Sequence, residues 1–342
     1  RDRTEDAMAL LEKGYGITAT ALSDHMHSQL VQWQALGFAL VGKGEEAVKK
    51  INEASQLRAQ AGGPFYTAFH HIISAGVYTR VEDFKKAKEA IDKGVAIAEN
   101  IPSTYLTICA LFHLSYLKFI AESPEAALDD LEVALSLMKI NGYDHFWGWE
   151  PVMMKRLLGL AVKRDIEKNF AQSLAKKRLQ ANFSDDGEPI PLLKFAFMDA
   201  FEMSFTGNTL FKSEGLSRYQ RELLGLVVTA KGQQVPQEKI QLELWPENPP
   251  DKARKSFDTL LSRLRKKLSP QLPLPVKNYL YIQKGIVCLN NCEIDALEFI
   301  EAARTGLAHS KNSDWWQARN AFQKALSLWK RALPEDLSLI HI

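Results

Sequence analysis

A cluster of positive side chains between residues 252 and 267 is the part of this sequence best suited to bind a charged ligand. Seven Lys or Arg residues stand there against one acid, Asp258. Lysine and arginine neutralise phosphate groups, and arginine can also bond guanine O6 and N7 as a bidentate donor. A charge run by itself is equally typical of a solvated face on a structural domain, so the elements that position the cluster have to decide between the two interpretations.

The apolar residues inside the same segment predict an amphipathic helix over about Lys252–Leu268. Phe257, Leu261, Leu264 and Leu268 follow one another at i, i+4, i+7 and i+11, which is one helical face and must cover a core. A helix about 10–12 Å across fits the major groove of DNA. The opposite face carries Lys255, Asp258, Thr259, Ser262, Arg263 and Lys266.

The segments around this helix predict a small α+β domain over residues 192–291. Ser217 and Gln220 form a capping box at the start of a helix that runs to about Ala230, with Tyr219 and Leu226 on its apolar face, and Pro236 starts a second helix that holds Leu242. Short β-prone runs precede and follow these helices. They are Leu193–Met198, Phe201–Phe205 and Leu210–Lys212, then Tyr279–Ile282 and Ile286–Leu289 joined by Gln283-Lys284-Gly285.

Three stretches of this domain resemble the OmpR-type winged helix-turn-helix in the version found in antibiotic-regulatory activators. They are LSRYQRELLGLVVTAKGQQV, LELWPENPPDKARKSFDTLLSRLRKKL and YLYIQKGIVCL. The resemblance implies that Asp258, Thr259, Ser262 and Arg263 approach bases, that Lys255, Arg265 and Lys266 hold the DNA backbone, and that Lys284 lies at the tip of the wing. The wing lacks the family's Arg-Gly-x-Gly-Tyr pattern, and Leu260 stands where the family often has a polar residue, so the operator sequence stays open.

Residues 1–181 repeat with a period of 40, which predicts paired helices in an α-solenoid. The pattern resembles tetratricopeptide repeats in the longer form of the maltose-activator type. Helices are expected upstream of each repeat register at Ser28–Leu40, Phe69–Thr79 and Thr107–Ile120, and a divergent last pair at Glu150–Leu160 and Asp165–Gln180. The four registers are Ala7, Ala47, Ala87 and Ala127; Leu11, Ile51, Ile91 and Leu131; Gly14, Ala54, Gly94 and Ala134; and Ile17, Leu57, Ile97 and Leu137.

Aromatic residues gather after the last regular repeat, and two interpretations of them stay open. Tyr143, Trp147 and Trp149 can line a groove that binds a small molecule or a partner, or together with His145 and Phe146 they can fill the junction with the next domain. The histidines at 70, 71 and 113 have no carboxylate or cysteine at ligand spacing, so they are expected to be structural.

The expected organisation is therefore mainly α: a tetratricopeptide-like solenoid over 1–181, a linker over 182–191, the winged helix over 192–291, and a truncated helical domain over 292–336. The last part, with a helix over Trp315–Ala332, resembles the start of the bacterial transcriptional activator domain. Both ends look cut, and residues 337–342 (LSLIHI) look like a sequencing-adapter scar. Regulators with such repeats often carry a nucleotide-binding switch upstream.

Composition and motifs narrow the class of function. Residues 192–291 carry a net charge of +6 in a chain of +2, so a polyanion is expected to meet this module alone. No nucleotide-binding loop, nucleophile elbow, zinc motif or catalytic cluster is visible, so neither catalysis nor a cofactor is expected. Three unpaired cysteines and short apolar runs favour a cytoplasmic protein away from membranes.

The sequence therefore predicts a transcriptional regulator, most simply an activator, that binds double-stranded DNA, contacts RNA polymerase and can pair as a homodimer on DNA. An effector, small molecule or protein, is expected on the repeats. Two rivals remain: an interaction scaffold whose winged helix binds protein, and RNA binding, which lacks the aromatic platform that stacks on bases.

Overall fold

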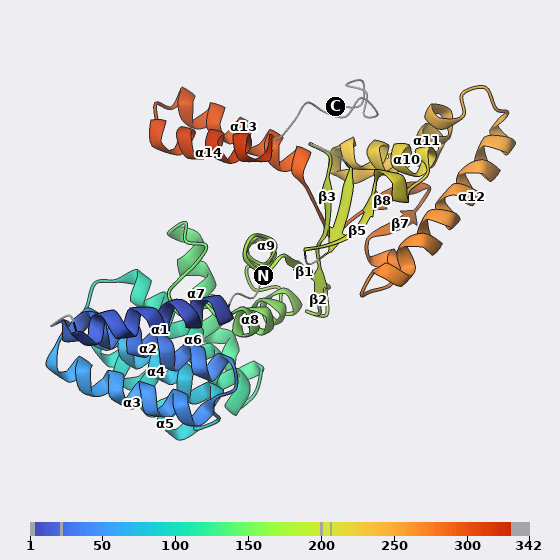
Figure 1. The fold of residues 1–342 in the computed structure, drawn as a ribbon. Helices are drawn as coiled ribbons and strands as arrows, with labels where there is room; N and C mark the ends of the chain where they lie inside the picture. Colours follow the sequence, from blue (N-terminus) through green and yellow to red (C-terminus); the bar gives the residue numbers. More distant parts are fainter. Residues whose placement is uncertain (1–3, 21–22, 199–200, 206, 330–342) are drawn as a thin grey trace. The chain divides into compact units, whose positions relative to one another are not determined.

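The protein is mainly helical, with small sheets confined to its C-terminal part. The computed structural model describes residues 4–20, 23–198, 201–205 and 207–329 (Figure 1). Contacts divide the chain into two compact units, residues 1–189 and 190–342. The division falls inside the segment predicted as a linker. The predicted adapter scar, 337–342, lies outside the described residues.

Unit 1 consists of helices packed in successive pairs, α2 with α3, α4 with α5, and α6 with α7. The first helices of these pairs also contact one another, α2 with α4 and α4 with α6. Helix starts follow local rules: the side chains of Asp83 and Ser103 each accept a hydrogen bond from a backbone N–H of the first turn. The helices are α1 (Thr4–Thr20), α2 (Asp24–Leu40), α3 (Gly44–Gln60), α4 (Pro64–Arg80), α5 (Phe84–Ala98), α6 (Thr104–Ala121), α7 (Leu128–Ile140), α8 (Pro151–Lys163) and α9 (Lys168–Leu174).

The 40-residue registers are buried where a helix has neighbours on both sides. Ile51, Ile91 and Leu131 are fully buried, and so are the alanines at 47, 87 and 127. The expectation fails at the first repeat, because Ile17 is 60% exposed on α1. The fourth register is also shallower than expected, since residues 57, 97 and 137 are only half-buried.

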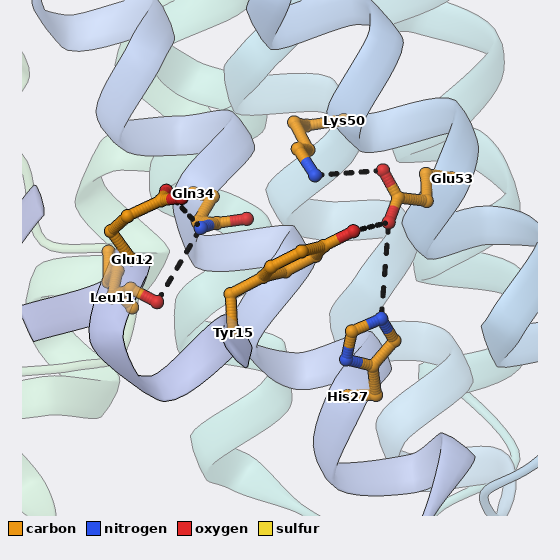
Figure 2. A network of polar contacts seen from close by, with 7 residues as sticks. All are labelled: Leu11, Glu12, Tyr15, His27, Gln34, Lys50 and Glu53. Carbon is orange, nitrogen blue, oxygen red and sulfur yellow. Dashed lines mark hydrogen bonds and ion pairs between the residues drawn. The ribbon is translucent and has the colours of Figure 1, made fainter. Parts of the chain in front are cut away.

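Polar contacts attach α1 to the first pair of helices (Figure 2). The Glu53 carboxylate on α3 accepts a hydrogen bond from Tyr15 Oη of α1 at 3.1 Å and one from Lys50 Nζ at 3.0 Å. His27 Nε2 of α2 lies 4.0 Å from the same carboxylate. Gln34 of α2 donates to Glu12 of α1 at 3.2 Å. One acid thus connects side chains from three helices.

The helix α6 is long and apolar enough to cross a membrane by length and composition, contrary to the expectation from short apolar runs. Half of its apolar window is buried inside unit 1. Leu106, Ile108 and Phe112 are all fully buried there, in the core shared with α4, α5 and α7. A central helix of a packed helical protein has this composition, and the burial accounts for it without a bilayer.

The end of unit 1 is more structured than predicted. The expected helix Asp165–Gln180 is α9 followed by a wide turn over Ala175–Leu179, and it ends at Gln180 in a left-handed conformation (φ +50°). Residues 182–191 are not a plain linker: β1 (Ala181–Phe183) pairs with β2 (Pro189–Pro191), and a turn at Ser184–Glu188 joins them.

Unit 2 holds two sheets around one apolar core. The first has the order β5-β4-β3-β9 and the second β6-β8-β7. All pairings are antiparallel except β3 with β9, which runs parallel from Leu193 opposite Cys292. The elements are β3 (Leu193–Ala196), β4 (Glu202–Phe205), β5 (Asn208–Lys212), α10 (Arg218–Thr229), β6 (Gln234–Pro236), α11 (Gln237–Leu244), α12 (Pro250–Leu268), β7 (Leu280–Gln283), β8 (Ile286–Leu289), β9 (Cys292–Ile294), α13 (Asp295–Lys311) and α14 (Trp315–Leu328).

The predicted strands and helices of unit 2 are present with shifted ends, while β6 and β9 were not predicted. The capping box of α10 is confirmed, with Ser217 Oγ accepting from the Gln220 N–H and Gln220 Oε1 accepting from the Ser217 N–H. Tyr219 was expected on the apolar face of α10 but is 44% exposed, and Leu242 of α11 is 69% exposed.

The start of α13 is fixed to the first sheet. One Asp295 carboxylate oxygen accepts from the Phe197 N–H at 2.8 Å and the other from the Met198 N–H at 3.0 Å. The next helix, α14, ends at Leu328, where Trp329 takes an extended conformation and its ring lies 5.2 Å from that of Phe299. Residues 330–336 of the predicted last domain lie outside the described part.

Candidate nucleic-acid interface

The helix α12 divides sharply into a buried and an exposed face. Phe257 and Leu264 are fully buried, and Leu261 and Leu268 are 3% and 2% exposed, so the predicted apolar stripe is confirmed. Leu260, at 8%, widens this stripe. These side chains belong to the same core as residues of α10, β7 and β8. Burial of one face fixes the rotation of the helix about its axis, and therefore decides which side chains meet solvent.

All four predicted base-reading residues lie on the exposed face of α12. Asp258, Thr259, Ser262 and Arg263 are exposed, and so are Lys255 and Lys266. The Thr259 hydroxyl donates to the Lys255 carbonyl at 2.8 Å, which leaves its oxygen lone pairs and its methyl group toward solvent. Helical spacing brings 255, 259, 262, 263 and 266 to one side. The structure thus brings these predicted residues together.

Arg265 departs from the predicted set. Its side chain is partly buried, burial lowers the pKa of its guanidinium, and its Nε has no hydrogen-bond partner among the described residues. By helical spacing it lies at the edge of the exposed face, beside Arg254 and Asp258. Arg265 is therefore less accessible to a backbone phosphate than Lys255 and Lys266.

Two cations that the sequence had counted but not assigned belong to the exposed face of α12. Lys252 and Arg254 are exposed in its first turns. Within the described ranges, neither they nor Lys255, Arg263 and Lys266 form an ion pair with a carboxylate. The charges are therefore available to an external anion.

The hairpin β7–β8 projects a lysine at its turn. Its two-residue turn places Lys284 at φ +49° and Gly285 at φ +78°, the left-handed pair that a tight hairpin needs. Lys284 is exposed. The unpredicted strand β6 pairs with β8, and the Gln237 N–H donates to the Gly285 carbonyl at 2.9 Å. The start of α11 is thus anchored to the turn, which positions the hairpin relative to the helices (Figure 1).

The aromatic candidates after α7 separate into core and surface. Phe146 is fully buried and stacks on Phe112 at 4.8 Å, and Trp149 is half-buried against Phe146. Trp147 is 46% exposed, and its backbone N–H donates to the Tyr105 hydroxyl at 2.8 Å. Tyr143 is half-buried with its ring 5.7 Å from that of Tyr105.

Of the three residues predicted to line a groove, Tyr143, Trp147 and Trp149, Trp147 is therefore the most exposed to solvent. An apolar hollow of about 530 Å³ does exist in unit 1, but it lies between α1 and α2 beside Leu11 and Trp33 and includes none of these aromatics. Phe146 therefore belongs to the core of unit 1, while the groove interpretation of Tyr143, Trp147 and Trp149 stays a prediction.

Buried histidines make unit 1 sensitive to acid. Burial lowers the pKa of His70 to about 3 and that of His113 to about 4, both below the usual 6.5. The unfolded chain therefore binds protons that the folded chain does not, and stability is lost as the pH falls below 6.5.

We expect each of these histidines to remove about 1.4 kcal/mol of stability per pH unit below pH 6.5, so that the two together contribute a loss of about 4 kcal/mol between pH 7.5 and 5. Urea unfolding at several pH values measures this. His113→Ile, which introduces the residue found one period earlier at Ile73, should remove about half of the slope between pH 6.5 and 5. Equal slopes in the two proteins would show that His113 is not held neutral.

Comparison with known proteins does not place this chain in a family. No family model matches the chain, and no curated protein matches it at a significant level.

Proposed function

We propose that the chain is a sequence-specific DNA-binding transcription regulator in which unit 2 acts as a winged helix-turn-helix. The observation that carries the proposal is the exposed face of α12, where Lys252, Arg254, Lys255, Arg263 and Lys266 have no carboxylate partner in the described part of the chain. Cations without intramolecular partners on a helix fixed by a buried ridge suit a polyanionic duplex.

Each side chain is given a role by its chemistry. Arg263 bonds guanine O6 and N7, Thr259 and Ser262 exchange hydrogen bonds with base edges, and Asp258 accepts from a cytosine amine. Lys255 and Lys266 bind phosphates on either side of the groove, and Lys284 reaches the adjacent groove or backbone from the hairpin turn. Arg265 takes no part in this scheme.

The paired helices of unit 1 support the second half of the proposal. We infer that they form a tetratricopeptide-like solenoid that senses an effector and alters self-association, so that two winged helices engage repeated half-sites and contact RNA polymerase in the cytoplasm. The adjacency of repeated helix pairs and a basic reader in one chain supports this division of labour.

A random-sequence selection tests the proposal directly. The full chain is incubated with a library of random duplexes, and the bound fraction is amplified and sequenced over several rounds. A repeated motif is expected, with a spacing between copies that gives the half-site geometry. The alternative function, a scaffold whose winged helix binds protein, is supported by exposed aromatic residues such as Trp315 and Trp316 (66% and 65%), and it predicts no enrichment.

Single substitutions separate base reading from backbone binding. Arg263→Ala should cost about 1–3 kcal/mol on the selected site and relax the preference for one base pair. Lys266→Ala should weaken binding to all duplexes and lower the slope of log K against log salt by about one. Fluorescence anisotropy on the selected and a shuffled duplex measures both. If the two variants lose the same affinity on both duplexes, the division of roles is wrong.

A further inference from the structure

Unit 1 contains a buried arginine that has no carboxylate partner. Arg58 on α3 is 4% exposed. Its Nη1 lies 3.0 Å from His25 Nδ1 and donates to the Ala61 carbonyl at 3.2 Å. Its Nε and Nη2 have no hydrogen-bond partner among the described residues. Leaving a buried cation unpaired is costly.

A second buried arginine in the same unit shows how such a charge is normally compensated. Arg80 on α4 donates from Nε to Glu150 Oε2 at 2.7 Å, and Nη2 lies 2.5 Å from the same oxygen. Glu150 is only 2% exposed and the Arg80 side chain 17%, so the pair is largely buried. Arg58 has the burial of this pair without its anion.

The repeat itself shows that packing does not require a charge at this place. One and two periods of 40 after Arg58 stand Ala98 and Met138, 5% and 0% exposed. The same holds for Gln32, which is fully buried in α2 where the later repeats have Ile72 and Phe112, also fully buried. The repeat that contains Gln32 and Arg58 therefore has polar residues at core positions where the later repeats have apolar ones.

The substituted positions lie on neighbouring helices, with Gln32 of α2 facing α4 and Arg58 of α3 facing α2. Gln32 Oε1 lies 2.9 Å from His70 Nδ1, and the ring of His25 packs edge-on against Tyr66 at 4.5 Å. The Arg58 guanidinium lies 5.7 Å from the same Tyr66 ring. His25, Ser28, Gln29 and Gln32 follow at i, i+3, i+4 and i+7 along one face of α2.

Donors outnumber acceptors in this cluster. Ser28 Oγ, Gln29 Nε2 and Gln32 Nε2 are buried without a partner among the described residues, like the two nitrogens of Arg58. Among the described residues, no carboxylate is bonded to any of these groups. A cluster of this kind lacks an acceptor that carries negative charge.

We propose that this cluster, with Arg58 at its centre, is a binding site for a carboxylate or phosphate group carried by a small molecule. Nε and Nη2, the two unpartnered nitrogens, share an edge of the guanidinium that presents two parallel N–H groups, and such an edge holds a carboxylate or phosphate through two charge-assisted hydrogen bonds. Tyr66, half-buried over Arg58, is the side chain whose movement admits the anion.

The effector of unit 1 would therefore be a small molecule that carries a carboxylate or phosphate group. The anion site can exist without the proposed DNA-binding function, but its role in regulation rests on that function. The anion would neutralise Arg58 and bridge α2, α3 and α4, so that binding stabilises the arrangement of the first two helix pairs.

Isothermal titration calorimetry of the full chain with inorganic phosphate and, separately, with succinate at constant ionic strength tests the site. We expect saturable binding of one equivalent of at least one of the two anions, and the comparison assigns the group to phosphate or carboxylate. Arg58→Met, which introduces the residue of the last register, should weaken that binding about 100-fold or more, because two charge-assisted bonds are lost. Arg156→Met, which removes an exposed arginine of the same unit, should change nothing.

Two further variants keep the result decisive. If Arg58→Met does not fold, Gln32→Ile, the residue found one period later, should fold and weaken binding roughly 10-fold, by the loss of one donor to a charged group. Arg263→Ala on α12 should leave anion binding intact, and Arg58→Met should leave affinity for duplex DNA intact, so failure here is distinct from failure of the proposed function. The proposal is overturned if neither anion binds, or if it binds Arg58→Met or a folded Gln32→Ile as tightly as the unaltered chain.

Discussion

Replacing Lys255, Lys266 and Lys284 together with alanine is expected to lower the affinity of the full chain for double-stranded DNA on the order of 100-fold at 0.1 M salt. Each lysine is proposed to neutralise one phosphate, and each phosphate contact releases about 0.9 counterion from duplex DNA. The slope of log K against log salt should therefore become shallower by about 2.7. Anisotropy titrations at several salt concentrations measure both quantities.

The matched control removes the same charge from elsewhere. Lys49, Lys85 and Lys155 are exposed lysines on unit 1, and alanine at all three changes the net charge of the chain equally. DNA affinity should then change by less than about 3-fold, because all the proposed phosphate contacts in unit 2 are kept. If both triple variants lose affinity alike, binding follows net charge rather than the α12 face and the hairpin turn, and the proposed interface is wrong.

Glu150→Ala is expected to destabilise unit 1 by about 3–5 kcal/mol, the cost of leaving a buried charge without its partner. The substitution would strand the Arg80 guanidinium, which is held at 2.7 Å by a carboxylate that is 2% exposed. Glu150 also ends the segment that carries Trp147 and Trp149, so the pair joins this aromatic segment to α4. Urea unfolding followed by circular dichroism measures the loss, with unit 1 as a separate transition.

A double variant distinguishes charge from packing. Arg80→Met alone leaves Glu150 buried and unpaired, whereas Arg80→Met with Glu150→Leu removes both charges and keeps apolar volume. The double variant should be more stable than either single one, since buried ion pairs can be replaced by apolar residues at little cost. Stabilities that simply add would show that the two side chains do not interact. Burial raises the pKa of Glu150 above its usual 4.5. The folded chain therefore holds this proton more tightly than the unfolded chain does, and Glu150 contributes more to stability below pH 4.5 than above its raised pKa.

Local patterns of the sequence were sufficient for the elements that carry the candidate interface. The apolar stripe of α12 predicted which face is buried, and therefore which side chains are exposed, because a helix has a fixed period of 3.6 residues. The capping box at Ser217 and the turn at Lys284-Gly285 were predicted for the same reason: each motif is completed within four residues.

Several features could not be predicted because they depend on partners distant in sequence. Strands β6 and β9 have three residues each, too short for a period, and exist because β8 and β3 offer them hydrogen bonds. Leu242 has an apolar side chain, yet it is 69% exposed in the described structure. Arg265 belongs to a run of basic residues in the sequence, and only the packing of unit 2 shows that it is partly buried.

What the sequence determined by itself was therefore the period and polarity of each element: helix pairs repeating every 40 residues, an amphipathic basic helix, and a hairpin after it. What tertiary structure alone decided was the pairing of charges. Arg80 and Arg58 look alike in the sequence, but one finds Glu150 seventy residues away and the other finds no carboxylate among the described residues. Local backbone preferences act over a few residues, whereas compensation of a buried charge requires whichever side chains the fold brings within hydrogen-bond distance.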